Sequence, residues 1–382
     1  MSATVNDSKP LALPFAPRPI NGEPITSWAR RLACANGMSL EHLLEYIVAP
    51  VDASGAAGQL DYGAPKHWRA AMAALARVPE IWIWALDLQQ QFPGVDRDWF
   101  LRNPRCPDRL MSAYCPDCFR MQIANGKTLH LKAEWMIALA TRCPHHSSPL
   151  LIQCPQCGTY DPVCFRLPRL VRCVRCDQDL TANVSRQRTR PVLASFGRAL
   201  ADAFACKVPE AFWAPNLTAR AFRRLVADLL WMFTTTELID RSYGFALVDR
   251  VARLRPKYGR DFAKPFCARS WAHREAVASA IVLMLLGSDA DCDFKASGRI
   301  SIKDFLGAKS QRLVHRVRYW PAEMSARIDS ARILRANGKI KKRGKSVWAY
   351  PDSQAESFPI TRVLLAQIRK FNARGNGVVD AR

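Results

Sequence analysis

Cysteine and histidine recur in close pairs within one stretch of the chain, and such pairs could hold metal ions. They read YCPDC at 114–118, CPHH at 143–146, CPQC at 154–157 and CVRC at 173–176. Each pair places two soft ligands on one tight turn, so two pairs complete the four-coordinate site that structural Zn²⁺ prefers. The 15 residues between Cys157 and Cys173 are a spacing typical of zinc ribbons.

Pairing these half-sites in chain order predicts two structural zinc sites. The first is Cys115, Cys118, Cys143 and His146, and the second is Cys154, Cys157, Cys173 and Cys176. The C-x-x-H spacing favours His146 over the neighbouring His145, and an interleaved pairing would use the same ligands in another topology. Because four protein ligands leave no position for water, we expect the ions to stabilise the fold and to do no chemistry.

Two other uses of cysteines, disulfides and a redox motif, do not fit the pattern. Disulfides need an oxidising compartment, and the first 25 residues lack the apolar core of a signal peptide. A thioredoxin-like motif uses one C-x-x-C, not four half-sites in series. No run reaches the roughly 18 apolar residues of a membrane span. The 13 cysteines without a secretion signal therefore predict a cytoplasmic protein. The lack of a long apolar run predicts no membrane partner.

The positive charge is concentrated in the rear half of the chain. Residues 1–182 carry 19 Lys and Arg against 16 Asp and Glu, a net charge of +3. Residues 183–382 carry 37 against 17, a net charge of +20. Such an asymmetry indicates an acidic polymer as partner, with nucleic acid the leading candidate.

The elements before the cysteine pairs are predicted to be helical. A proline-rich arm at 13–28 should lie over a helix that Thr26 or Ser27 caps and that Asn36-Gly37 ends. Ser39 should cap a second helix at 40–48. Helix, turn and helix give the outline of a helix-turn-helix, yet the second helix carries Glu41 and Glu45 and no Lys or Arg, which favours a scaffold.

Two further helices are predicted before the first pair and one inside the first site. The former are 65–78 and a run that starts at Pro79, whose Trp68, Trp82 and Trp84 are expected to be core residues. The latter is an amphipathic helix at 127–142 that would lead into CPHH. On it His130 and Glu134 would stand four residues apart, as surface groups.

The ordered set of motifs resembles the TniQ family, which includes TnsD-like target selectors of cut-and-paste transposons. The resemblance covers roughly residues 13–180 and lies in GEPITSWARRLACANGMS, YCPDC, a Trp-bearing segment running into CPHH, and LLIQCPQCG. Its zinc positions correspond to the eight ligands above. The family usually places Gly after its C-x-x-H pair, where this chain has Ser147.

That resemblance implies a DNA-transposition accessory protein and not a transposase. Such a protein would select or mark the target and recruit the AAA+ ATPase regulator of the transposon (TnsC- or TniB-like). Family members choose the target by direct DNA contact or through an RNA-guided Cascade–crRNA complex, to which TniQ binds as a dimer. The resemblance therefore also favours a homodimer.

The rear half supplies the predicted nucleic-acid surface. Helices are expected at 216–233 and 272–286, after a basic hinge at 187–191. Residues 295–345 hold 15 Lys and Arg against three acids. In 304–350 a basic helix after a Gly turn, followed by a short hairpin, has the pattern of a recognition helix and a wing. The predicted DNA-contacting residues are Arg312, His315, Arg316, Arg318, Lys341, Lys342, Arg343 and Lys345.

No catalytic motif accompanies these features. The chain has no P-loop, dinucleotide glycine motif, nucleophile elbow or H-E-x-x-H. The closest carboxylate cluster, Asp289, Asp291 and Asp293, is better explained as a loop between helices. The alternatives to a transposition adaptor are a zinc-containing transcription regulator without a transposition partner, and a nucleic-acid enzyme with an unrecognised active site.

These inferences predict a mainly α protein in four parts. An N-terminal arm and helix-turn-helix-like domain would occupy 1–104, and a tandem zinc-ribbon or zinc-finger module 105–182. A basic helical domain with a second helix-turn-helix-like or winged segment at 304–350 would occupy 183–355. A C-terminal helix and tail would follow at 356–382.

Overall fold

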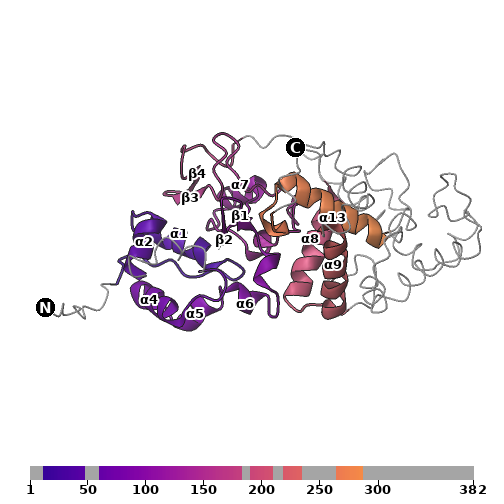
Figure 1. Ribbon diagram of the computed structural model, residues 1–382. Coiled ribbons are helices and arrows are strands. Elements are labelled where there is room, and N and C mark those ends of the chain that lie inside the picture. The colour runs from indigo at the N-terminus through magenta and orange to yellow at the C-terminus, as the bar shows by residue number, and fades with distance from the viewer. Residues whose placement is uncertain (1–11, 48–59, 183–189, 210–217, 235–263, 287–382) are drawn as a thin grey trace, which may run out of the picture.

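The computed structural model describes residues 12–47, 60–182, 190–209, 218–234 and 264–286 (Figure 1). The basic hinge at 187–191 lies largely outside these residues. So do the acids at 289–293, the whole 304–350 segment and the tail at 356–382.

Within the described residues the fold is rich in helices, as the sequence predicts, and it also has two small sheets. Its α-helices are α1 (Ile25–Ala35), α2 (Leu40–Ile47), α4 (Lys66–Ala76), α5 (Glu80–Trp84), α6 (Leu88–Gln91), α7 (Pro116–Ala124), α8 (Pro191–Phe204), α9 (Ala219–Thr234) and α13 (Trp271–Leu286). Short 3-10 turns lie at Arg97–Trp99, Ala133–Met136 and Phe266–Ala268. No helix in the described ranges is long and apolar enough to cross a membrane.

The first helix begins two residues earlier than predicted. Pro24 precedes α1, so Thr26 and Ser27 lie inside its first turn and not at its cap. Their hydroxyl groups serve distant partners instead, since Thr26 donates to the Asp61 carboxylate at 2.6 Å and Ser27 accepts from the Leu131 amide at 2.9 Å. The end of α1 is as predicted, with Gly37 in the left-handed region at φ 68°.

The proline-rich arm packs over this helix, as expected. The Leu13 amide donates to the Leu75 carbonyl at 2.8 Å, and the Trp28 indole donates to the Pro17 carbonyl at 2.8 Å. Ser39 caps α2 by accepting from the His42 amide at 3.2 Å, also as predicted.

The helix predicted from Pro79 onward breaks in two. The Asp87 carboxylate accepts from the Gln89 amide and so caps α6. It also accepts from the amides of Gly63 and Ala64, which ties the break to the preceding loop. Because α5 is only five residues long and buries Ile83 alone, Trp82 and Trp84 are 41% and 38% exposed. The prediction that they are core residues was wrong, whereas Trp68 is buried.

The prediction of an amphipathic helix at 127–142 was also wrong. This segment is non-helical except for the 3-10 turn at Ala133–Met136. Almost every side chain from Leu131 to Cys143 is buried, so the segment has no solvent face of the kind that an amphipathic helix needs. Its amides bond to other parts of the chain instead, such as Ala138 to the Trp99 carbonyl at 2.8 Å. The helix of this region is α7, which starts within YCPDC.

Both sheets are two-stranded and antiparallel. Strands β1 (Arg102–Asn103) and β2 (Cys106–Leu110) form the first, and β3 (Val163–Arg166) and β4 (Leu170–Cys173) form the second. In the second sheet Val163 pairs with Cys173 and Arg166 with Leu170.

Two hydrophobic cores organise the described residues. The smaller core lies between residues 25 and 86 and contains Trp28 and Met72. The larger core runs from Leu88 to Leu285 and joins the cysteine-rich region to α8, α9 and α13, which pack side by side (Figure 1). The helices predicted at 216–233 and 272–286 are present as α9 and α13. The division of the chain into four parts stays a prediction.

Candidate metal centres

The first cluster joins the start of α7 to a turn 25 residues later. Cys115 occupies the N-cap of α7, where its sulfur accepts from the Cys118 amide at 3.4 Å. The Cys118 sulfur lies 3.5 Å from that of Cys143 and 3.3 Å from Nδ1 of His146. Nδ1 of His146 is 3.6 Å from the sulfur of Cys115 and 3.6 Å from that of Cys143.

These distances suit a tetrahedral zinc ion. Zn–S bonds of about 2.3 Å and Zn–N bonds of about 2.0 Å place tetrahedral ligand atoms roughly 3.5 to 3.8 Å apart. The four ligand atoms lie within 4.8 Å of one another, and none of the cysteines is in a disulfide. The donor set therefore fits Zn²⁺ held by Cys115, Cys118, Cys143 and His146.

The neighbouring His145 turns away from this cluster. Its Nε2 lies 2.5 Å from Nζ of Lys132 and 3.8 Å from the Glu134 carboxylate. Burial, with Lys132 and Arg198 nearby, lowers the pKa of His145 to about 4. Of the two adjacent histidines, His146 is the one that the fold places among the thiols.

The second cluster lies at the base of the β3–β4 hairpin. The sulfurs of Cys154 and Cys176 are 3.7 Å apart, and those of Cys157 and Cys173 are 3.6 Å apart. All four ligand atoms again lie within 4.8 Å of one another. The half-sites thus come together in chain order and are not interleaved.

Three of the four half-sites share one backbone turn. In each, the amide of the first ligand bonds to a carbonyl five residues ahead, and the amide four residues ahead bonds back to the first ligand's carbonyl. The residue after the second ligand is left-handed every time: Ser147 at φ 56°, Gly158 at φ 67° and Asp177 at φ 58°. Glycine adopts this conformation without strain, whereas a serine does so at a cost.

The thiols also alter the protonation of the histidine. Hydrogen bonds with Cys115 and Cys143 raise the pKa of His146 to about 10, because the imidazolium is stabilised beside sulfur. Hydrogen bonds from Cys118 and Cys143 lower the pKa of the Cys115 thiol. A metal ion needs neutral imidazole and thiolate, so its binding would release protons.

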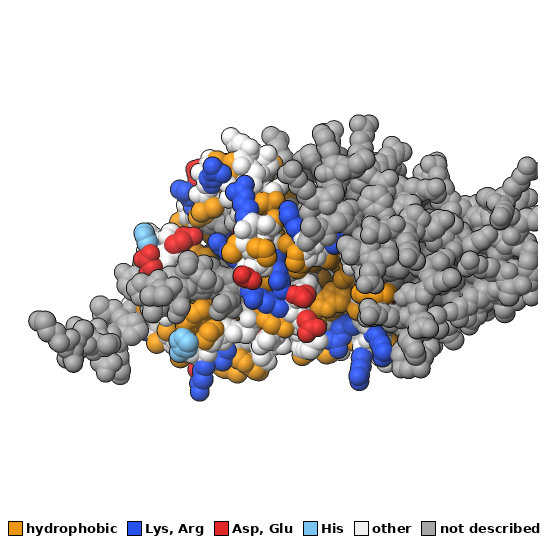
Figure 2. Space-filling model, in the orientation of Figure 1, with side chains coloured by type: hydrophobic (Ala, Val, Ile, Leu, Met, Phe, Trp, Pro, Cys, Tyr) orange, Lys and Arg blue, Asp and Glu red, His pale blue; other side chains and the backbone are white. Residues whose placement is uncertain are grey.

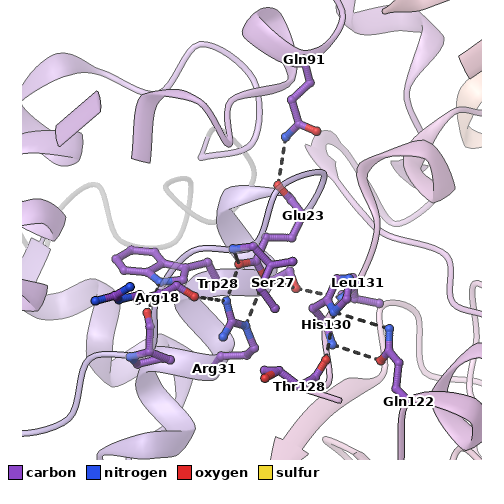
Figure 3. A network of polar contacts seen from close by, with 12 residues as sticks. Arg18, Glu23, Ser27, Trp28, Arg31, Gln91, Gln122, Thr128, His130 and Leu131 are labelled. Atoms are coloured by element: carbon purple, nitrogen blue, oxygen red, sulfur yellow. Dashed lines mark hydrogen bonds and ion pairs between the residues drawn. The ribbon is translucent and has the colours of Figure 1, made fainter. Parts of the chain in front are cut away.

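A network of buried hydrogen bonds joins the N-terminal arm and α1 to the segment between α7 and Cys143 (Figure 3). The fully buried Glu23 carboxylate accepts from both ends of the Arg31 guanidinium, from the Ile20 amide and from Ser27. Burial raises the pKa of Glu23, and Arg31 opposes that shift. In turn, the Ala133 amide donates to the Gly22 carbonyl at 2.8 Å.

Arg30, on the same helix, reaches the second cluster. Its guanidinium lies 2.5 Å from the carboxylate of Asp161, which sits between the two cysteine pairs of that cluster. The Asp161 carboxylate also forms an ion pair with Arg109, whose Nη2 lies 3.6 Å from its Oδ2. The sequence patterns did not predict roles for Glu23, Arg30 and Asp161. For Arg30 the available signal was a charged residue on a helix whose apolar residues already fill a core, whereas Glu23 and Asp161 lie outside the helices.

Helices α8 and α13 pack against the CPHH turn. The Arg142 guanidinium lies 2.7 Å from the Glu275 carboxylate of α13, and Arg190 lies 3.2 Å from it. The Arg190 amide donates to the Ser147 carbonyl at 3.3 Å, and Arg198 donates to the Pro144 carbonyl at 2.8 Å. A metal ion in the first cluster would thus stabilise the surface on which the rear helices rest.

His130 and Glu134 are not i, i+4 neighbours on a helix, because that helix does not form. Nδ1 of His130 lies 3.0 Å from the Thr128 carbonyl, and Glu134 lies beside Lys132. The predicted DNA-contacting residues between 312 and 345 lie outside the described residues.

In the described part of the chain, helices pack around two Cys/His clusters, each of which could hold a metal ion with four protein ligands. The family model described as TniQ matches residues 14–150, which include the arm, α1, α2 and the whole first cluster. The match confirms, over these residues, the resemblance that the motifs predict, and it associates the chain with DNA transposition. No curated protein matches the chain.

Proposed function

We propose that this chain is a non-catalytic accessory protein of DNA transposition that selects or marks the target site and recruits an AAA+ transposition regulator. The match of residues 14–150 to the TniQ family carries this proposal. The geometry supports an architectural role, because both candidate metal centres have four protein ligands and leave no position for substrate.

Each cluster binds one structural Zn²⁺ in this proposal. The direct test is the zinc content of purified variants. We expect two ions in the natural protein, one after Cys118→Ser and one after Cys157→Ser. Cys106→Ser is the matched control, since Cys106 is exposed and lies outside both clusters. A protein that purifies with no zinc and folds normally would contradict the assignment.

The partner test is co-purification with the AAA+ ATPase of the same transposon. We expect the tagged full-length chain to retain the ATPase, and the Cys118→Ser variant to retain less of it because the first cluster supports the surrounding surface. Binding to a specific DNA site with no retention of the ATPase would favour a zinc-containing transcription regulator instead.

Target choice has two routes in this proposal. Direct DNA contact would involve the basic 304–350 segment, and replacing Arg312, Arg316 and Arg318 with Ala should then reduce affinity and flatten the salt dependence by about 0.9 per lost phosphate contact. Targeting through RNA would appear as retention of a Cascade–crRNA complex by the chain, which we expect to act there as a homodimer.

A further inference from the structure

The tip of the β3–β4 hairpin projects beyond the core that holds its base. Val163 and Phe165 of β3 are buried, as are Val171 and Cys173 of β4. At the tip, residues 166–170 are all exposed, and at the opposite end of β4 residues 174–175 of the CVRC turn are exposed as well. The hairpin is thus a rigid two-stranded ribbon, fastened below by the second cluster and open above.

Its exposed part is basic. Residues 162–176 contain Arg166, Arg169, Arg172 and Arg175 and no Asp or Glu. Lys and Arg side chains are visible at the upper left of the molecule, where Figure 1 places β3 and β4 (Figure 2). Arg169 and Arg175 are both exposed. Neither is paired with a carboxylate among the residues that the structure describes.

The acidic residues that flank the hairpin in the sequence do not neutralise Arg169 and Arg175. Asp161 is engaged by Arg30 and Arg109 at the base of the hairpin. Asp177 lies 2.9 Å from Arg166, and the Asp179 carboxylate accepts from the amide and hydroxyl of Thr181. Arg169 and Arg175 therefore leave the exposed edge positive.

We propose that the exposed residues of this hairpin, with Arg169 at the tip and Arg175 in the CVRC turn at the base as the main contacts, bind the phosphate backbone of duplex DNA. A two-stranded ribbon has the width that the major groove admits, and arginine donates two parallel hydrogen bonds to a phosphate. This inference rests on the proposed role at a DNA target, and it adds a surface separate from the 304–350 segment.

The side-chain composition of the exposed residues favours a duplex over a single strand. Single-stranded nucleic acid is held largely by bases stacking on aromatic side chains. The exposed side chains of 166–170 and 174–175 include none, and Phe165 is buried beneath them. The exposed Leu167 and Val174 are apolar residues of the size that contacts sugars and thymine methyl groups.

The test is equilibrium binding of the full chain to a labelled duplex of mixed sequence across a salt series. We expect Arg169→Ala with Arg175→Ala to weaken binding about tenfold and to lower the salt slope by about one per arginine. The double variant Arg169→Lys with Arg175→Lys should keep most of that slope, because the charges remain. Two zinc ions per chain and unchanged helical content would show that the variants fold.

The matched control removes the same charge elsewhere. Lys66 at the start of α4 and Lys207 after α8 are both exposed, and their double Ala variant should bind DNA like the natural protein. Equal losses in both double variants would mean a general charge effect and would overturn the inference. An unchanged slope in the arginine variant, or no duplex binding by the natural protein, would also overturn it.

Two further outcomes separate this inference from the proposed function. Tighter binding to a single-stranded RNA of equal length, with the same arginine dependence, would make the hairpin an RNA-binding surface and overturn the duplex assignment. Retention of the AAA+ ATPase is measured independently, so the accessory role can stand when the hairpin inference fails, and the reverse also holds.

Discussion

Two adjacent histidines acquire opposite properties from their surroundings. Beside thiols, His146 has its pKa raised to about 10, whereas burial and Lys132 lower that of His145 to about 4. Spacing in the sequence favours His146, but only the positions of Cys115, Cys118 and Lys132 show why the ring of His146 is the one that faces the thiols.

Replacing each histidine separately tests that difference. We expect His146→Ala to reduce the zinc content from two ions to one, because it removes one of four ligands. His145→Ala should keep two ions, since its ring contacts Lys132 and not sulfur. Elemental analysis of the purified variants checks both. Loss of an ion from the His145 variant alone would reverse the ligand assignment.

Asp61 gives the fold a pH dependence of its own. Burial raises its pKa from 3.8 to about 6, although Thr26 donates two hydrogen bonds to it. Because the folded pKa is the higher one, this contribution to stability is fully present below pH 4 and is lost as the pH rises through 6.

Asp61→Asn removes the titrating group and should remove this dependence. Between pH 7.5 and pH 5 the natural protein should gain about 1 kcal/mol of unfolding free energy relative to the variant. Chemical denaturation at both pH values, with zinc present throughout, checks this. A gain by the variant over the same range would mean that Asp61 is charged and well paired in the folded state.

At the scale of elements, the turns were easier to predict than the segments between them. Pro, Gly and capping Ser fix backbone angles locally, so the end of α1 and the start of α2 came out as expected. The 127–142 segment has a helical pattern of apolar residues, yet it forms no α-helix because neighbours surround it on both sides. Burial from all directions removes the solvent-facing side that the prediction of an amphipathic helix requires.

The shared turn of three half-sites predicts opposite effects for two substitutions. Ser147→Gly should stabilise the zinc-bound protein by about 1 kcal/mol, because a left-handed residue with a side chain is strained. Gly158→Ser should destabilise it by a similar amount, since Gly158 is left-handed. A Cβ there would meet no atom within 4 Å, so backbone strain alone would cause the loss. Denaturation in saturating zinc measures both.

If the two substitutions changed stability in the same direction, backbone strain would not be the cause. Metal content serves as the control, because neither residue supplies a ligand and both variants should keep two ions.

Across the whole molecule, buried ion pairs link elements that are far apart in the sequence. Arg30 of α1 reaches Asp161, and Arg142 beside the first cluster reaches Glu275 of α13. Both links end next to a candidate metal centre. The clusters therefore lie where the front and rear of the described chain meet.

Glu275→Gln should destabilise the protein by roughly 3 kcal/mol, because it removes the carboxylate that is paired with the buried Arg142 guanidinium and with the half-buried Arg190. Asp98→Asn is the control. It breaks an ion pair with Arg102 whose acid is 80% exposed, and it should cost less than about 1 kcal/mol. Equal shifts in thermal unfolding would contradict the structural role of Glu275.

The sequence by itself determined the types and spacing of the candidate metal ligands, the resemblance to the TniQ family, and the helices α1, α2, α4, α9 and α13. Each of these depends on neighbours within one turn or on the order of motifs along the chain. Only the tertiary structure decided that the half-sites meet in chain order, that α5 leaves two tryptophans exposed, and that Arg30 and Arg142 hold distant elements to the clusters. The links of Arg30 and Arg142 depend on contacts between residues about 130 positions apart, which no local pattern records, because a buried charge is recognisable only once its partner is in place.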